Sequence, residues 1–338
     1  MKKQPTWIGA VLAMGLAATG AGAQETVVRI QDYPGLGTLI YRVAAAKGFC
    51  AKHGLRCEMQ MIPTVPLGIQ ALLAKTIDVA MAAPDVAFNA AIKGADIKAI
   101  GSGLQRTPLQ IVVRPELDVP NGEQDFKPMM AALRGKKIGV PARGSSGELG
   151  FVRMATLAGF KAEDYTFVAV GSPVTSYGAL KSRQVDASMT FEPSASICEV
   201  IGDCKAVYVG ARASVPTEIT ATTGAATVLL VSREMTERTP AVANAIFAAG
   251  KDAEAFMQDP ANFQEVVAIA GKDAKFNIPR GDEILAASVK LTLPSVKMAL
   301  SRAGLKQYAA NMAAMGQLSQ PFDTDRLVYD PDAKSGGR

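Results

Sequence analysis

The stretch GVPARGSSGELG, residues 139–150, holds the residue types with the most chemical options in this chain. A short apolar strand runs into a turn of small residues, and a helical pattern follows. Such a turn can cradle a phosphate, expose a nucleophilic serine, hold an anionic group or cap a helix. The spacing excludes two of these, because the serines are out of step with G-x-S-x-G and no Gly-Lys-Ser/Thr follows. A ligand-binding turn and a helix cap remain.

Different residues of this stretch are suited to the helix cap and to ligand binding. Ser145 and Glu148 match a capping box, in which both side chains satisfy backbone N–H groups internally. We therefore expect the N–H groups around Ser146 and Gly147, with the Ser146 hydroxyl, to contact a ligand. Arg143 and Arg106, which follows the strand-like segment IKAIGSGLQ, are the candidates for binding a carboxylate or sulfonate, which a guanidinium matches in a bidentate fork. An arginine paired within the protein is an equally good interpretation.

Catalytic and metal sites find little support. The one histidine, His53, lies in CAKHGLRC rather than beyond a strand, and a Ser-His-Asp device would depend on it. GLGTLI at 35–40 lacks the third glycine of a dinucleotide fingerprint, and no carboxylate or His/Cys set has metal-ligand spacing. We expect a binding protein without catalytic residues, cofactor or metal. A cleft enzyme that does not need His53 is the alternative from another class.

The first 23 residues are typical of a secretory signal peptide. Lys2 and Lys3 precede an uncharged stretch that ends in AGA, so we expect cleavage near Ala23 and export to the periplasm. A retained N-terminal anchor is the alternative. The formal net charge of +5 becomes +3 without the two lysines, and the charges form no basic runs. This distribution argues against nucleic-acid binding.

The four cysteines form two close pairs, Cys50 with Cys57 and Cys198 with Cys204. In an exported protein such local pairs most simply form disulfides. A zinc site would require both pairs to come together from distant segments.

The chain repeats itself. ALLAKTIDVAM (71–81) and ALKSRQVDASM (179–189) share their pattern at an offset of 108 residues, including Asp78 and Asp186, which we expect to hydrogen-bond locally and away from any cleft. Strands are expected at 26–31, 57–62 and 77–82, with helices at 37–47 and 66–75. The second copy predicts strands at 136–140, 165–170 and 185–190, with helices at 146–158 and 174–183. This alternation predicts an α/β fold with two lobes, each a mainly parallel sheet flanked by helices.

The lobes divide the chain unevenly. We expect the first lobe to comprise 24–107 plus 235–338, the second lobe 108–234, and the hinge to lie near 107–114 and 222–234. Strand-like segments at 109–116 and 227–234 are expected to form the paired entry and exit of the second lobe. From about Met235 onward the pattern is helical.

Ligands in open α/β sheets bind beyond the carboxyl ends of the strands, so the turns after the strands are the candidate site. Tyr33 and Phe191 could sandwich an apolar part of a ligand. Glu192 could accept from an amine or hydroxyl, or pair with Arg106 or Arg143. The full candidate set is Tyr33, Pro34, Gly35, Thr64, Ala83, Pro84, Asp85, Arg106, Arg143, Ser145, Ser146, Gly147, Ser172, Thr190, Phe191 and Glu192.

Several of these motifs together resemble a known family. IYRVAAAKGFCAKHGLRCEMQMI, GIQALLAKTIDVAMAAP, LRGKKIGVPARGSSGELG and VDASMTFEP resemble the nitrate/sulfonate/taurine-type substrate-binding proteins of ABC importers, over about residues 27–260. Proteins that bind thiamine pyrimidine precursors belong to the same broad family. The resemblance implies a two-lobed type II periplasmic binding fold, a hinge of two crossing segments, and delivery to a membrane permease with a cytoplasmic ATPase.

The family pattern places pocket residues at the turns named above, with two departures. Val65-Pro66 stands where small hydroxyl and glycine residues are common, and Phe191 stands for tryptophan. The family's pyrimidine synthase needs a cysteine-rich motif and a histidine that this chain lacks. We expect a monomer that closes on a small organic anion, a sulfonate or carboxylate. An uncharged or cationic heteroaromatic, such as a pyrimidine precursor, is the alternative ligand, and a sensor co-receptor is an alternative role.

Overall fold

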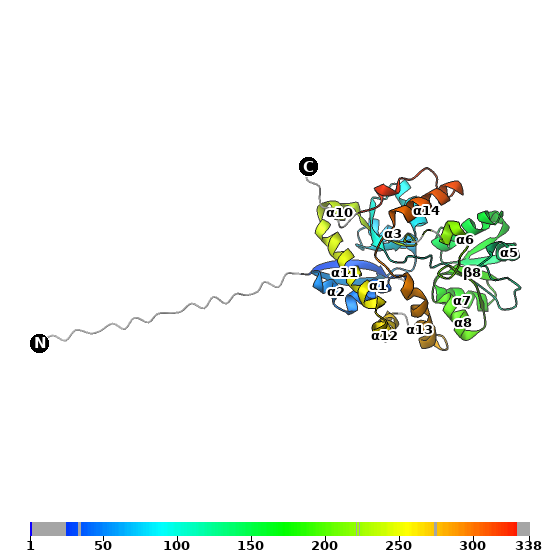
Figure 1. Cartoon of the computed structure of the whole chain (residues 1–338), viewed down its shortest axis with the longest axis horizontal. Coiled ribbons are helices and arrows are strands. Elements are labelled where there is room, and N and C mark those ends of the chain that lie inside the picture. Colours follow the sequence, from blue (N-terminus) through cyan, green and yellow to red (C-terminus); the bar gives the residue numbers. More distant parts are fainter. Residues whose placement is uncertain (2–24, 33–34, 221, 223, 274–275, 330–338) are drawn as a thin grey trace.

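The computed structural model describes residues 1, 25–32, 35–220, 222, 224–273 and 276–329. The expected signal peptide, apart from Met1, lies outside the described residues. The chain folds into two lobes side by side, with the first sheet region and the C-terminal helices on one side and α5 to α8 on the other (Figure 1). No described helix combines the length and the apolar character that a membrane span requires.

In the described ranges, the first lobe is built on five strands. β1 (Thr26–Asp32) pairs in parallel with β2 (Leu55–Met61), and a bridge from Ile30 to Val79 links β1 to the segment before β3 (Ala80–Ala82). β10 (Val228–Ser232) lies antiparallel between β3 and β4 (Ile97–Ser102). The helices that connect these strands are α1 (Leu39–Ala46), α2 (Phe49–Lys52), α3 (Val65–Leu73) and α4 (Pro84–Ile92).

The second lobe repeats this plan in one sheet of order β7-β6-β8-β5-β9. β6 is parallel to β7 and β8, whereas β5 is antiparallel to β8 and β9. The strands are β5 (Gln110–Val113), β6 (Lys137–Val140), β7 (Thr166–Ala169), β8 (Ala187–Thr190) and β9 (Lys205–Val209). The helices are α5 (Phe126–Ala132), α6 (Ser146–Leu157), α7 (Pro173–Lys181), α8 (Ser194–Ile201), α9 (Thr217–Thr220) and a 3-10 turn at Ala162–Asp164.

The repeated strand–helix order and the mainly parallel sheets are confirmed, but the expected pairing of the two connecting strands is wrong. β5 belongs to the second-lobe sheet, and β10 belongs to the first-lobe sheet rather than to the expected second-lobe range 108–234. Each strand fills the gap between two parallel strands and satisfies backbone groups on both sides. We propose that the chain therefore returns to the first lobe before Val228.

The repeated aspartates fix equivalent strands in the two lobes. The Asp78 carboxylate accepts the backbone N–H of Arg29 at 2.8 Å and pairs with the Arg29 guanidinium. The Asp186 carboxylate accepts the backbone N–H of Lys137 at 2.9 Å and pairs with Arg114. Their partners are far away in sequence, so the expectation of local bonding is wrong. Each aspartate instead joins the first strand of its repeat to the third.

The C-terminal helices complete the first lobe. They are α10 (Arg233–Arg238), α11 (Pro240–Gln258), α12 (Phe263–Asp273), α13 (Gly281–Thr292) and α14 (Arg302–Ala314), with 3-10 turns at Pro260–Asn262, Leu293–Ser295 and Thr324–Arg326. Ile246 and Met298 share a core with Val28, and Leu305 shares another with Phe88. The described C-terminal helices thus bury apolar residues against strands and helices of the first lobe, and α13 also packs against α8 of the second lobe.

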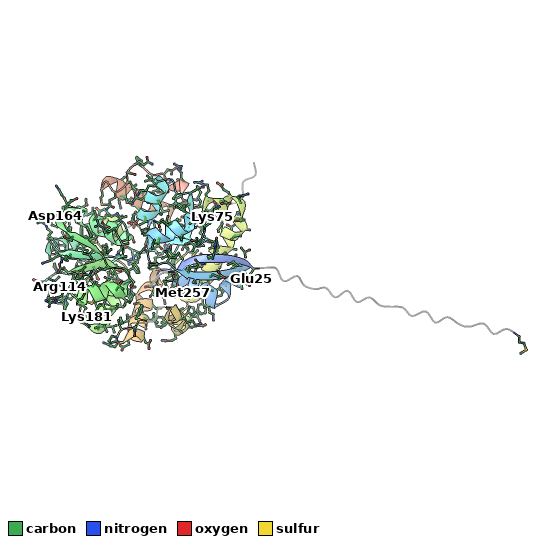
Figure 2. All side chains as sticks on the ribbon, turned by 180° about the vertical axis from the view of Figure 1, so that it is seen from behind. Glu25, Lys75, Arg114, Asp164, Lys181 and Met257 are labelled. Carbon is green, nitrogen blue, oxygen red and sulfur yellow. A yellow bond between two sulfur atoms is a disulfide. The ribbon has the colours of Figure 1, made fainter. Side chains whose placement is uncertain are left out.

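Both expected disulfides are present. Cys50–Cys57 joins α2 to β2, and Cys198–Cys204 joins α8 to the residue just before β9. Each disulfide therefore restrains the short connection between a helix and the strand that follows it. Viewed from behind, charged side chains such as Arg114, Asp164 and Lys181 lie on the second lobe and Lys75 lies on the first (Figure 2).

Candidate functional site

A cavity of about 90 Å³ lies where the two lobes meet. One water needs roughly 10–15 Å³ of such space, so the cavity can hold a small molecule. Its walls come from the turns after β1, β3 and β8, from the start of β5, and from α6, α13 and α14. The lining residues are Leu36, Gly37, Val65, Met81, Ala82, Ala83, Leu104, Arg106, Thr107, Pro108, Leu109, Gln110, Ser146, Arg153, Phe191, Glu192, Ala211, Ile219, Thr222, Ala226, Thr227, Leu291, Thr292, Ser295 and Tyr308.

Five of the residues expected from the sequence line this cavity: Ala83, Arg106, Ser146, Phe191 and Glu192. They come from both lobes and from the segment that joins them. The turns after equivalent strands of the repeat therefore face each other across one space, as the rule for open α/β sheets predicts.

The other expected residues that the structure describes lie outside the cavity wall. Thr64 and Ser172 precede α3 and α7 as N-caps, Pro84 and Asp85 begin α4, and Thr190, Ser145 and Gly147 are buried. Arg143 is exposed. Tyr33 and Pro34 lie outside the described residues.

Gly35 of the first lobe lies close to the turn after β8 of the second lobe. A Cβ atom at this position would come within 2.8 Å of the Glu192 carbonyl oxygen and 3.2 Å of the Phe191 ring. Glycine is thus required here for close approach.

Arg106 carries a positive charge at the cavity wall, on the segment between β4 and β5. Its Nη2 donates to the Ala213 carbonyl at 3.2 Å, and its backbone N–H donates to Ser295 Oγ at 2.8 Å. Within the described ranges, no carboxylate forms an ion pair with this guanidinium. The second-lobe carbonyl positions the side chain but leaves its charge uncompensated.

The capping box expected at Ser145 and Glu148 is wrong. Ser145 is the N-cap of α6, but its hydroxyl accepts a long 3.4 Å bond from the Ala142 N–H instead of capping the helix. Glu148 accepts from the Gly144 N–H at 2.7 Å and from Arg143 Nε at 3.0 Å. Arg143 holds the Glu148 carboxylate at the Gly144 N–H, one residue before the N–H of the N-cap residue Ser145 that a capping box would use. Arg143 is thus paired within the protein.

Glu192 is buried in a shell of neutral donors. Its Oε1 accepts from Gln110 Nε2, and its Oε2 accepts from the hydroxyls of Ser196 and Ser288, each at 2.6 Å. Neither arginine considered from the sequence pairs with it. Burial raises the pKa of Glu192, and the three donors oppose that shift. Ser288 lies in α13, so this carboxylate also joins the second lobe to the C-terminal helices.

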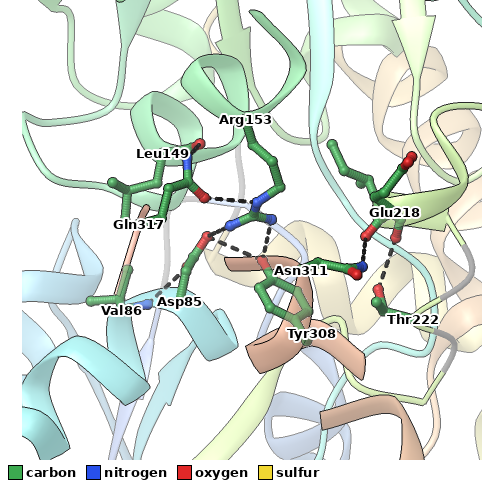
Figure 3. Close-up of polar contacts among 10 residues, drawn as sticks. Asp85, Val86, Leu149, Arg153, Glu218, Thr222, Tyr308, Asn311 and Gln317 are labelled. Carbon is green, nitrogen blue, oxygen red and sulfur yellow. Dashed lines mark hydrogen bonds and ion pairs between the residues drawn. The ribbon is translucent and has the colours of Figure 1, made fainter. Parts of the chain in front are cut away.

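Arg153 was missed in the sequence and is the most buried charged group of the cavity wall. Its side chain is 2% exposed and donates to Asp85 Oδ2 at 3.0 Å, to Tyr308 OH at 2.8 Å and to Gln317 Oε1 at 3.0 Å (Figure 3). A single arginine within the apolar run LGFVRMATLAGF was the available signal, because it lies on the buried face of the expected helix.

Further contacts around Arg153 join the lobes. Gln317 donates to the Leu149 carbonyl at 3.2 Å, and Asn311 of α14 donates to the Glu218 carbonyl at 2.7 Å (Figure 3). Tyr308 and Ser295, also missed, come from the C-terminal helical region, where no local motif distinguishes them. Their position depends on how that region packs against the first lobe.

Comparisons with known proteins agree on this architecture. The sequence profile of the family described as NMT1/THI5 like matches residues 38–262. A protein of Brucella abortus (strain 2308), provisionally named a binding protein, is 33% identical over 196 residues, or 56% of this chain and 56% of that protein. The match therefore spans little more than half the length of the curated relatives.

Solved structures show the fold. The alkanesulfonate-binding protein SsuA of Xanthomonas axonopodis pv. citri, bound to MOPS, has a TM-score of 0.73 and 18% identity, covering 91% of this chain and 99% of that one. The periplasmic nitrate-binding protein NrtA of Synechocystis PCC 6803 has a TM-score of 0.70 and 14% identity, covering 90% and 86%. The chain has the two-lobed periplasmic binding protein fold.

Proposed function

The chain belongs to the NMT1/THI5 like family, and we propose that it is the solute-binding component of an ABC importer that captures a small organic anion, a sulfonate or carboxylate. The named functions of the structural relatives support an anionic ligand, since one binds alkanesulfonate and another nitrate. The cavity between the lobes is the proposed binding site. The role is capture and delivery rather than catalysis.

Arg106 carries this proposal. Arg106 is an exposed residue that lines the cavity, and its guanidinium is bonded to a neutral carbonyl, so an anionic ligand group would supply a counter-charge. A hydrogen bond between charged groups is about twice as strong as a neutral one, and guanidinium geometry suits sulfonate and carboxylate oxygens. The Ser146 hydroxyl at the start of α6 offers a second polar contact on the opposite lobe.

The cellular setting follows from the same proposal. The leader at residues 1–23 would direct export to the periplasm, with cleavage near Ala23. The loaded protein would then dock, as a monomer, on a membrane permease served by a cytoplasmic ATPase. The two disulfides fit an oxidising compartment.

An uncharged or cationic heteroaromatic is the second candidate ligand. The cavity wall is predominantly apolar, and Leu36, Met81 and Phe191 offer a surface on which a flat ring could stack. Such a ligand would not need the charge of Arg106.

Native mass spectrometry of protein purified without refolding tests the ligand class, because a closed cleft retains bound solute. Calorimetric titration with the recovered ligand should then show at least a tenfold loss of affinity in Arg106→Ala, the usual effect of losing a charged hydrogen bond. Arg143→Ala is the matched control, since Arg143 lies outside the cavity wall and should leave affinity unchanged. A recovered ligand without an acidic group, or full affinity in Arg106→Ala, would overturn the anion assignment.

A further inference from the structure

The cavity wall contains a second arginine whose charge is already compensated. Among the described lining residues the two arginines are Arg106 and Arg153, and only Arg153 has a carboxylate partner. That partner, Asp85, lies on the opposite lobe at the start of α4, immediately after β3. The two arginines therefore present different charges to a ligand.

Asp85 and Arg153 form a closed, neutral group with Tyr308. Asp85 is 0% exposed, and its Oδ2 accepts from Arg153 Nη2 at 3.0 Å and from Tyr308 OH at 3.1 Å. The remaining Asp85 oxygen accepts from the Val86 N–H at 2.8 Å. Arg153 in turn donates Nη1 to the Tyr308 oxygen (Figure 3).

The surroundings keep Arg153 and Tyr308 protonated. Burial alone would lower the pKa of the Arg153 guanidinium, but Tyr308 and Asp85 more than offset it, so the pKa is raised. Burial also raises the pKa of the Tyr308 hydroxyl, which keeps its proton and serves as a neutral donor. One positive and one negative charge therefore cancel at this end of the cavity.

Glu192, the buried carboxyl group of the cavity wall, does not add a site for a second anion. Glu192 is held by three neutral donors, and burial raises its pKa, which favours the uncharged acid. Arg106 thus supplies a positive charge without a carboxylate partner among the described residues, while other lining residues such as Leu36 and Phe191 offer apolar contact.

We propose that Asp85 is a specificity-determining residue that acts through Arg153: by cancelling its charge, Asp85 restricts the site to ligands with a single anionic group on an apolar body. This inference rests on the proposed anion-binding function and narrows it to monoanions. A dianion would place its second charge against a neutral pair and lose hydration without gaining a cation.

Calorimetric titration of the mature protein with ethanesulfonate and 1,2-ethanedisulfonate tests this inference, since the two probes share a two-carbon body and differ by one anionic group. Asp85→Asn keeps the shape of the side chain and frees the charge of Arg153. The double variant Asp85→Asn/Arg153→Gln removes both charges and keeps a hydrogen-bonding pair. Asp78→Asn is the matched control, because Asp78 pairs with Arg29 away from the cavity.

The wild type and Asp78→Asn should bind ethanesulfonate more tightly than the disulfonate. Asp85→Asn should shift the ratio of the two affinities toward the disulfonate by about tenfold or more, as expected for one added charged hydrogen bond. The double variant should restore the wild-type ratio. If Asp85→Asn does not fold, the wild type and the double variant are compared instead. Both should then bind the monosulfonate more tightly than the disulfonate. Wild-type preference for the disulfonate, or an unchanged ratio in folded Asp85→Asn, would overturn the inference.

Failure of the proposed function has a different signature. Binding of neither sulfonate to the wild type would count against the anion assignment at Arg106. Even in that case, the Asp85→Asn variant should bind a sulfonate that the wild type does not, because its Arg153 no longer has a carboxylate partner. If Asp85→Asn binds neither sulfonate, the proposed role of Asp85 is overturned.

Discussion

Replacing Gly35 with alanine puts a methyl group at the contact between the two lobes. The added Cβ would lie 2.8 Å from the Glu192 carbonyl oxygen and 3.2 Å from the Phe191 ring, and Cβ atoms essentially never come closer than 3.0 Å to another heavy atom. The nearest atom belongs to the backbone, so the two turns must separate. Overpacking of this kind costs about 1–3 kcal/mol. Because the clash crosses between lobes, we expect ligand affinity to fall roughly five- to 150-fold.

Calorimetric titration with the recovered ligand measures this loss, and small-angle X-ray scattering of the liganded protein should show a larger radius of gyration. Scanning calorimetry of the unliganded protein should show little change, since the clashing atoms belong to the other lobe. Gly178→Ala is the matched control. Gly178 lies in α7, and an added Cβ there would have no heavy atom within 4 Å, so alanine should leave affinity unchanged and stabilise the helix by up to about 1 kcal/mol.

Wild-type affinity and an unchanged radius of gyration in Gly35→Ala would refute this reasoning. They would mean that the turn after β1 and the turn after β8 do not meet when the ligand is bound. A loss of affinity accompanied by an equal loss of stability would place the clash within the first lobe instead.

Two further predictions concern stability. Burial raises the pKa of Glu192, so this side chain binds a proton more tightly in the folded protein than in the unfolded chain. Protonated Glu192 therefore stabilises the fold at pH values below the ordinary glutamate pKa. This contribution is lost as the pH rises through the raised pKa. The melting temperature of Glu192→Gln relative to wild type should therefore increase between about pH 4 and pH 8, and a difference independent of pH would contradict the shift. Removing the second disulfide with Cys198→Ser/Cys204→Ser should lower the free energy of unfolding by roughly 2–3 kcal/mol in the chain-entropy view of such a short loop; equilibrium urea unfolding checks this, and unchanged stability would show that the loop is already restrained without the bond.

The sequence was most informative where structure is local. Strand and helix positions in both repeats follow from hydrophobic periodicity and turn residues within a few residues of each element, and the structure reproduces them to within about three residues. The disulfides were predictable for the same reason, since each joins cysteines in one short segment. The turns that face the cavity followed from the parallel sheets. Ala83, Phe191 and Glu192 were found in this way.

Long-range packing limited the rest. Nothing in the sequence of β10 specifies which lobe it joins, because an apolar strand can fill either gap. Tyr308 reaches the cavity only through the docking of α14 on α4, and Ser295 through the turn after α13. The cap at Ser145 failed because a competing partner, Arg143, holds Glu148. For β10, Tyr308 and Ser295 the outcome depends on contacts between segments that are far apart in the sequence, whereas the contact between Arg143 and Glu148 is local and competes with the cap.

The two lobes each place a buried carboxylate at an equivalent position of the repeat, but the two carboxylates have different partners. The turns after β3 and β8 are equivalent in the repeat, and each supplies one buried carboxylate that reaches beyond its own lobe. Asp85 reaches from the first lobe to Arg153, whereas Glu192 reaches from the second lobe to Ser288. The first carboxylate meets a cation and the second meets neutral hydroxyls. Duplication thus accounts for the equivalent positions of the two carboxylates, while their partners differ: Asp85 neutralises Arg153, and Arg106, the proposed anion-binding residue, has no carboxylate partner among the described residues.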